Sequence, residues 1–339
     1  MENKKINFCI MLIITVMTLI IITASVDLKD LPGLLSNTNS IYLLFAVIMM
    51  AGDWVFDGLV LNLITRTVYG KINYFKSLKI AVIGQYYSAI TPFSTGGQPV
   101  QVYLMSKDNI SVPKGSLILF NKFLIYQMSV TIYSLVMFML KLSFLFTEAK
   151  AALPFVIIGF TINLIVLFGI ILLFYKPDWI KPIVLFVYRF LNKINIMKDI
   201  DKYVGRLDKA MEEYLLSIQK IKENKKKSII LLILTMVQLT FYFSITYFVY
   251  LSLGLNDASL IDIIAIQSLV YMAASYIPTP GTAGASEGGY YLLFKPLFTK
   301  NLIVYALLLW RIISYYFRII FTGLVTLIDY IMRKKKVIA

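Results

Sequence analysis

The chain alternates long apolar runs with polar and basic segments. A helix of about 20 apolar residues spans the hydrocarbon core of a bilayer. Runs close to or above this length occur at 6–24, 41–61, 116–140, 153–174, 229–251 and 302–328. The first run follows two lysines, as in a signal peptide, but it is long for one and lacks a clean cleavage site, so we expect it to be retained. The pattern predicts an all-α, polytopic membrane protein with six full spans and one domain over 1–339.

Two further apolar stretches, residues 84–104 and 261–298, are broken by proline and glycine. Each break contains a Thr-Pro step, a Gly-Gly pair and two prolines. Proline removes a backbone donor and glycine weakens a helix, so the backbone must be irregular there. Surface loops would be the simpler explanation, but the apolar flanks of the second break are too short to span a bilayer. Irregular backbone at membrane depth requires surrounding protein or a water-filled cavity, and we therefore expect two re-entrant segments.

The composition supports this class and excludes several chemistries. Apolar residues make up 59% of the 339 positions, and the mean hydropathy is +0.78. The chain has no histidine and a single cysteine, Cys9, which excludes a Ser-His-Asp mechanism and a thiolate metal cluster. Neither break matches a P-loop or a dinucleotide-binding fingerprint. We expect no metal and no cofactor.

The 33 Lys and Arg residues fix an orientation. With both termini in the cytoplasm, most of them fall in inside segments, and the outside segments hold only Lys29, Lys141, Lys150, Lys295 and Lys300. The first break is then entered from the cytoplasm and the second from outside. Opposed interrupted segments in inverted halves are the sequence signature of a transport site. The detailed residues of the two breaks do not repeat, so inverted repeats remain one alternative.

The segment 175–228 is basic and carries several aromatic residues. This composition is compatible with RNA binding. Its predicted position beside the inner leaflet instead favours an anionic lipid surface, with amphipathic helices at 180–191 and 203–221. We therefore expect membrane phospholipids and no nucleic acid as partners.

Three charged residues near the second break are candidates for a site. Glu287 lies in the glycine-rich break, where a carboxylate needs a partner, and Arg311 on the last span is the expected one. The alternative is a structural ion pair that only holds the re-entrant segment. Arg318 follows Arg311 by seven residues, which places both on one helix face, where arginine suits a phosphate group. Snorkelling of Arg318 toward the inner leaflet is the competing interpretation.

Asp53 and Asp57 are four residues apart in the second run and share a helix face. Two buried carboxylates so close together do not both ionise unless their charge is compensated. A bound cation, a proton or Lys122 would compensate it. We consider ion or proton coupling here, with packing or pairing as the more conservative interpretation.

The breaks themselves supply further candidates for substrate binding, because the half-helix ends expose N–H groups that favour anions and the glycines allow close approach of a ligand. These candidates are Gln85, Thr91, Pro92, Gly96, Gly97 and Gln98 in the first break, and Pro278, Pro280, Gly281 and Gly284 in the second.

The two breaks carry a resemblance to a known family. Residues 85–101 (QYYSAITPFSTGGQPVQ) and 278–287 (PTPGTAGASE) resemble the two signatures of the lysylphosphatidylglycerol synthase transmembrane family, and Arg311 falls where that family has an arginine. Members include the flippase-like membrane domain of the multiple peptide resistance factors, which act in antimicrobial peptide resistance. The likeness covers essentially the whole chain.

The resemblance implies a flippase-like protein of the bacterial plasma membrane that moves anionic or aminoacylated phospholipid, or a lipid-linked sugar, between leaflets. The two-part resistance factors carry a soluble synthase domain after the membrane domain, whereas this chain ends shortly after its last apolar run. We therefore expect no lysyltransferase activity from the chain alone. A lipid-modifying enzyme, or a membrane subunit that serves a separate lipid synthase, is the alternative function.

Overall fold

The structure is a computed structural model that describes residues 38–70, 72–193 and 225–338, together with residues 207, 212 and 215. In these ranges the regular elements are helices, with no strand, which confirms the all-α prediction. Five helices are long and apolar enough to cross a membrane. They are α3 (Ser40–Val68), α6 (Val112–Leu140), α8 (Leu153–Tyr175), α11 (Lys225–Ser252) and a C-terminal helix over Leu302–Lys334. The expected run 6–24 and the stretch 203–221 lie outside the described residues, apart from the isolated positions 207, 212 and 215.

The C-terminal helix is not a uniform α-helix. It consists of α14 (Lys300–Arg311), a π-helical segment (Ile312–Phe317) and α15 (Arg318–Ile338). Short π-helical segments inside α-helices are often found at functional sites. Here the segment lies between the two arginines selected from the sequence.

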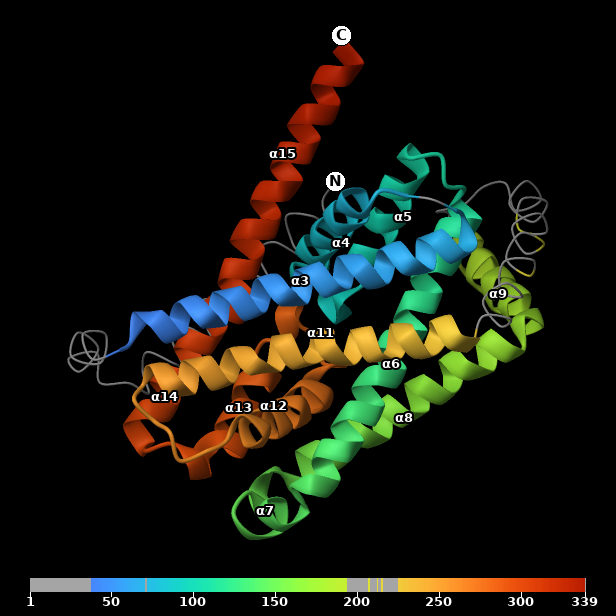
Figure 1. The fold of residues 1–339 in the computed structure, drawn as a ribbon. Coiled ribbons are helices and arrows are strands. Elements are labelled where there is room, and N and C mark those ends of the chain that lie inside the picture. The colour runs from blue at the N-terminus through green and yellow to red at the C-terminus, as the bar shows by residue number, and fades with distance from the viewer. Residues whose placement is uncertain are drawn as a thin grey trace.

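Helices α3 and α11 run side by side and antiparallel across the bundle (Figure 1). The amide N–H of Asn39 donates to the carbonyl oxygen of Ser252 at 2.8 Å, which joins the start of α3 to the end of α11. Gly52 lets the helices approach, since a Cβ atom there would lie 2.4 Å from the ring of Phe241. The end of α3 and the end of α11 therefore lie at opposite ends of the bundle.

A helix hairpin follows each of these two ends. The first consists of α4 (Tyr74–Ala89), the turn Pro92–Ser94 and α5 (Gly97–Lys107). The second consists of α12 (Leu260–Ala274), the turn Pro280–Thr282 and α13 (Ala285–Phe294). The hairpins enter from opposite ends, and their two turns are in contact. The Tyr315 hydroxyl donates to the Ala89 carbonyl oxygen at 3.2 Å and ties the first turn to the C-terminal helix.

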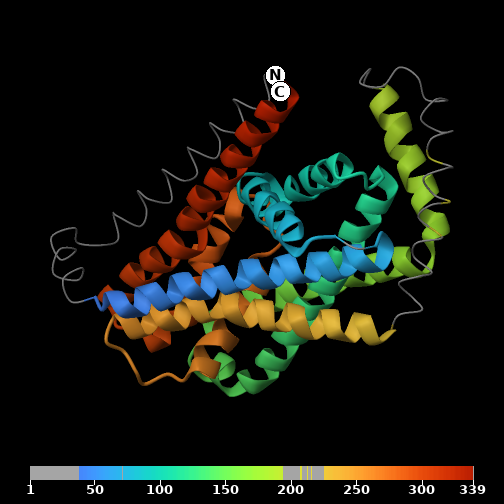
Figure 2. The same cartoon turned by 45° about the horizontal axis from the view of Figure 1, so that its top comes forward.

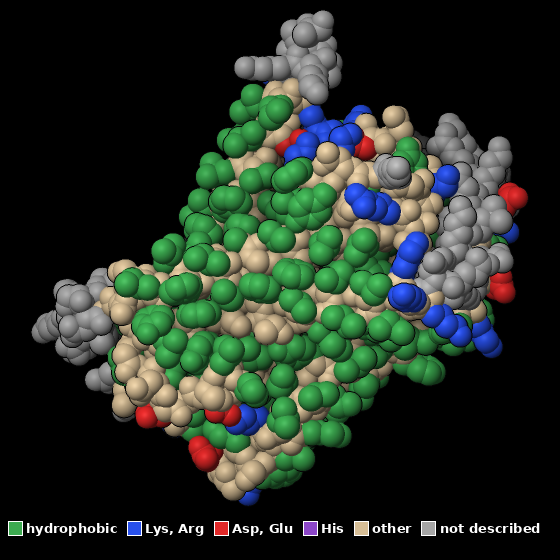
Figure 3. Space-filling view, in the orientation of Figure 1, with side chains coloured by type: hydrophobic (Ala, Val, Ile, Leu, Met, Phe, Trp, Pro, Cys, Tyr) green, Lys and Arg blue, Asp and Glu red, His purple; other side chains and the backbone are tan. Residues whose placement is uncertain are grey.

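The outer surface is that of a multi-pass membrane protein. On the face that Figure 3 shows, a broad apolar band crosses the molecule, with charged side chains gathered toward its two ends. Helix α8 contributes to this apolar surface, because its residues Ile158, Ile165 and Phe168 are each at least 60% exposed. Apolar patches of this extent indicate a surface covered by lipid.

Ion pairs join segments at both ends of the bundle. Lys79 and Arg333 both pair with Asp329, each at 2.7 Å, which connects α4 to α15. At the other end, Lys141 pairs with Asp262, which follows the capping residue Ser259 at the start of α12.

Short elements complete the described chain. Helix α9 (Ile180–Lys193) stands beside the bundle after the turn Pro177–Trp179 that ends α8 (Figure 2), so the predicted helix at 180–191 is present. The others are α7 (Leu142–Thr147) and the turns Lys150–Ala152 and Lys295–Leu297.

The packing of α8 on α12 provides a test of the fold. A Cβ atom at Gly159 would lie 2.4 Å from the Cα atom of Ala273, so the Gly159→Ala variant must push the two helices apart. Overpacking of this kind costs about 1–3 kcal/mol. We expect a lower melting temperature in detergent for Gly159→Ala. Gly169→Ala in the same helix has open space around it and is the matched control. Equal melting temperatures for both variants would contradict this packing.

Candidate functional site

The turn of the first hairpin is shaped by the residues of its Thr-Pro step. The Thr91 hydroxyl donates to the Tyr87 carbonyl oxygen at 2.7 Å and accepts from the Gly96 N–H at 2.9 Å. Pro92 begins the 3-10 turn, and Phe93 that follows it has a left-handed φ of 53°. This geometry lets α4 end and α5 begin within a few residues. Gly97 then allows α5 to cross α4, since a Cβ atom there would lie 2.5 Å from the Gly84 carbonyl oxygen.

The turn of the second hairpin is held by an ion pair. The Arg311 Nε donates to Glu287 Oε1 at 2.6 Å, and Arg311 Nη1 donates to the Gly281 carbonyl oxygen at 3.2 Å. Glu287 Oε2 accepts from the N–H of Gly284 at 2.7 Å and so caps α13. Gly281 and Gly284 have φ values of 60° and 86°, which glycine adopts without strain. The predicted partnership of Glu287 and Arg311 is confirmed.

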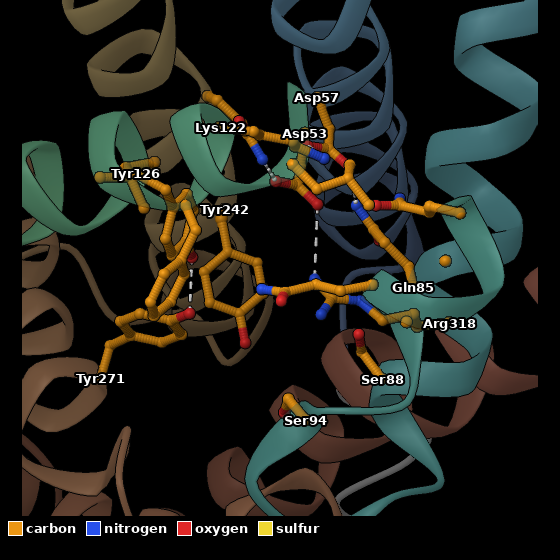
Figure 4. Close-up of a pocket in the computed structure, with 18 residues that line it drawn as sticks. Asp53, Asp57, Gln85, Ser88, Ser94, Lys122, Tyr126, Tyr242, Tyr271 and Arg318 are labelled. Atoms are coloured by element: carbon orange, nitrogen blue, oxygen red, sulfur yellow. Dashed lines mark hydrogen bonds and ion pairs between the residues drawn. The ribbon is translucent and has the colours of Figure 1, made fainter. Parts of the chain in front are cut away.

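The two aspartates of α3 are paired with cations from other helices. Lys122 of α6 lies 2.6 Å from Asp57, and Gln85 of α4 donates to the same carboxylate at 3.1 Å. Asp53 accepts from Gln238 Nε2 at 3.0 Å and lies 3.4 Å from Arg318 Nη2. Both aspartate residues, labelled in Figure 4, are 4% exposed. Pairing by Lys122, one of the alternatives from the sequence, is thus present for Asp57.

Two adjoining cavities lie inside the bundle. The smaller has a volume of about 230 Å³ and is lined by Asp53, Asp57 and Lys122 with residues of α4 and α5. The larger, of about 480 Å³, extends to both hairpin turns and reaches Arg311. Gln85, Gln98 and Arg318 line both, so the two volumes form one polar region in contact with both breaks.

The structure brings about half of the sequence-selected residues to these cavities. Those that line them are Asp53, Asp57, Gln85, Gly97, Gln98, Gly281, Arg311 and Arg318. The others shape or brace the turns without lining either cavity: Thr91, Pro92, Gly96, Pro278, Pro280, Gly284 and Glu287. Whether any of them binds a substrate stays a prediction.

Arg311 and Arg318 both line the larger cavity, but they do not form one pair of ligands on a regular helix face. Each is paired with a different carboxylate, Arg311 with Glu287 and Arg318 with Asp53. The π-helical segment between them also removes the α-helical spacing on which the shared face was predicted. The Arg318 guanidinium lies 5.0 Å from the Tyr242 ring centre, so it points into the bundle and not toward a leaflet.

Sequence analysis missed a group of tyrosines and glutamines that line the cavities. Tyr126 and Tyr271 share a hydrogen bond of 2.5 Å between their hydroxyls, and Tyr242 packs beside them (Figure 4). Gln127 donates to Asn163 at 2.7 Å and accepts from the Tyr276 hydroxyl at 2.8 Å. Only the glutamines, which are polar residues within apolar runs, could have been selected from the sequence as cavity residues. The tyrosines could not, since tyrosine is frequent throughout this chain.

The arrangement defines a class: a polytopic α-helical membrane protein with a polar cavity between two opposed helix hairpins. A family model described as the lysylphosphatidylglycerol synthase TM region matches residues 9–321, and the chain belongs to this family. The chain is also similar to a UPF0104 membrane protein of Archaeoglobus fulgidus. The two are 23% identical over 291 residues, which cover 85% of this chain and 87% of the relative. The family resemblance carried by the two breaks is confirmed.

The pairing of Asp57 with Lys122 generates a double-mutant test. Removing one partner leaves a buried charge without compensation, so Asp57→Asn and Lys122→Met should each lower the melting temperature in detergent. The double variant should recover part of the loss, with a coupling of about 0.5–3 kcal/mol. Additive effects of the two substitutions would show that the pair does not form. The exposed pair Lys76 and Asp108, at 3.1 Å, is the control and should couple by less than about 1 kcal/mol.

Proposed function

We propose that the protein moves the polar headgroup of a membrane lipid between leaflets, through the cavity that joins the two hairpin turns. The observation that carries the proposal is this cavity, because it touches both breaks and lies inside a bundle with an apolar outer band. Opposed half-helices that meet at a polar site are the usual design of secondary transporters. Family membership supports a lipid substrate, since the family takes its description from an aminoacylated phospholipid.

The residues divide into two roles under this proposal. Those that line the cavity would contact the headgroup, above all Arg311, Arg318 and Gln85. Glu287 would act as a positioning residue, because it holds Arg311 and caps α13 without lining the cavity. Asp53 and Asp57 would keep Arg318 and Lys122 in place and balance their charge.

The substrate we propose is an anionic or aminoacylated phospholipid, and the membrane is the bacterial plasma membrane. The basic segments support an orientation with the end of α15 on the cytoplasmic side, where Lys79 and Arg333 meet Asp329. The acyl chains would remain in the lipid outside the apolar band while the headgroup passes through the polar interior.

Headgroup inversion in proteoliposomes tests the proposal. We expect the wild-type protein to move a headgroup-labelled phosphatidylglycerol between leaflets, and Glu287→Gln to slow this by at least about tenfold, because the substitution releases Arg311 from its position. Arg311→Lys keeps the charge but removes the planar group that contacts both Glu287 and Gly281, and it should be slow as well.

Lys76→Met is the matched control, since Lys76 pairs with Asp108 at the exposed end of the bundle and lines neither cavity. It should invert lipid at the wild-type rate. Mass spectrometry of the lipids in the same vesicles tests the alternative function, a lipid-modifying enzyme. A wild-type rate no faster than protein-free vesicles, or a new lipid species made by the pure protein, would overturn the proposal.

A further inference from the structure

The larger cavity concentrates buried polar atoms that have no hydrogen-bond partner within the described part of the chain. In the described residues as a whole, nine side-chain polar atoms are buried and unpartnered. Six of the nine belong to residues that line this one cavity. They are Gln85 Oε1, Gln267 Nε2, Trp310 Nε1, Arg311 Nη2, Ser314 Oγ and Arg318 Nε.

Almost all of these atoms are hydrogen-bond donors. Gln267 uses its carbonyl oxygen to accept from the Thr246 hydroxyl at 3.0 Å, which leaves its amide N–H groups unpaired. Arg311 uses Nε and Nη1 on Glu287 and Gly281, which leaves Nη2. The indole of Trp310 can only donate, and the hydroxyl of Ser314 can donate or accept.

Burial makes unpartnered donors unfavourable, and native proteins seldom leave several of them together. Gln267, Trp310, Arg311 and Ser314 are each at least 94% buried, and they come from two elements, α12 and the junction of α14 with the π-helical segment. A group of donors in residues that line one cavity indicates a ligand that consists of acceptors.

A phosphate group has this character, because its oxygens accept several hydrogen bonds and, as a diester, it offers no donor. A sugar fits less well, since each of its hydroxyls also donates and would need acceptors. Among the unpartnered atoms, Gln85 Oε1 is the one that can only accept.

The charged side chains around the cavity are already paired, which limits how tightly the cavity would bind a phosphate group. Arg311 is already paired with Glu287, and Arg318 with Asp53. A phosphate group would therefore be held by hydrogen bonds in a charge-balanced site, and not by an excess of positive charge. This suits a ligand that must also leave, since a transported group has to bind weakly enough to be released.

We propose that Gln267, Trp310, Arg311 and Ser314 form a subsite for the oxygens of a phosphate group. The subsite rests on the proposed function in so far as the phosphodiester of a membrane lipid is its expected occupant. A free phosphate ester presents the same oxygens and is the other source.

Binding to the purified full chain in detergent tests the subsite without reference to transport. The probes are dioctanoyl phosphatidylglycerol, dioctanoylglycerol, which lacks the phosphate, and inorganic phosphate. We expect the phosphate-bearing lipid to bind at least about tenfold more tightly than dioctanoylglycerol. Ser314→Ala and Trp310→Phe each delete one donor and should weaken phosphatidylglycerol binding by about three- to tenfold, with dioctanoylglycerol binding unchanged.

Two matched controls separate a ligand site from donors that are merely unpartnered. Ser129 Oγ and Trp54 Nε1 are also buried without a partner among the described residues, but neither residue lines either of the two cavities. Ser129→Ala and Trp54→Phe should therefore bind all three probes as the wild type does. If these control variants weaken phosphatidylglycerol binding as much as Ser314→Ala and Trp310→Phe do, the subsite is wrong. It is also wrong if none of the four variants weakens that binding.

The probes also distinguish the two sources and separate this inference from the proposed function. Phosphatidylglycerol binding that depends on Ser314 and Trp310, without competition by millimolar inorganic phosphate, assigns the subsite to a lipid. Inorganic phosphate that displaces phosphatidylglycerol, with an affinity that also depends on Ser314 and Trp310, keeps the subsite but removes its support for lipid transport. Equal affinity for the two dioctanoyl lipids overturns the subsite, even if headgroup inversion is observed.

Discussion

The interior of the bundle depends on the pairing of every buried charge that its polar region contains. An unpaired charge in a medium of low polarity is strongly unfavourable, whereas a paired and hydrogen-bonded one is tolerated. Arg311 with Glu287 holds the turn of the second hairpin, and Lys122 with Asp57 joins α6 to α3. The pairs thus brace the second turn and join helices around the cavity.

The sequence was sufficient for the parts of the fold that depend on local composition. Five of the six predicted spans lie in the described residues and are present as helices, because an apolar run of the right length has few alternatives to a membrane helix. Both breaks were predicted because proline and glycine act on their own backbone. The two turns that touch are far apart in the sequence, and the bond from Tyr315 to Ala89 joins residues 226 positions apart. No local pattern encodes contacts of this kind.

Candidate site residues were predictable only where a residue type was unusual for its surroundings. Carboxylates in apolar segments are unusual, which made Glu287, Asp53 and Asp57 predictable. Their partners Arg311 and Lys122 follow from the need to pair a buried carboxylate. Trp310 and Ser314 give no such signal, since tryptophan and serine are ordinary residues in membrane helices. Arg311 and Arg318 both line the larger cavity, as the sequence predicted, but no sequence pattern indicated that a π-helical segment separates them or that each pairs with a different carboxylate.

The C-terminal helix serves two separate ion pairs. In a regular α-helix, residues seven apart lie on nearly the same face but about 10 Å apart along the axis, so each can contact different neighbours. Arg311, before the π-helical segment, pairs with Glu287 in the second hairpin, and Arg318, after it, pairs with Asp53 on α3. Both arginines line one cavity while each keeps its own carboxylate. The cavity therefore carries guanidinium groups at separate positions without a net positive charge from either, a property that favours reversible contacts with a ligand over tight binding.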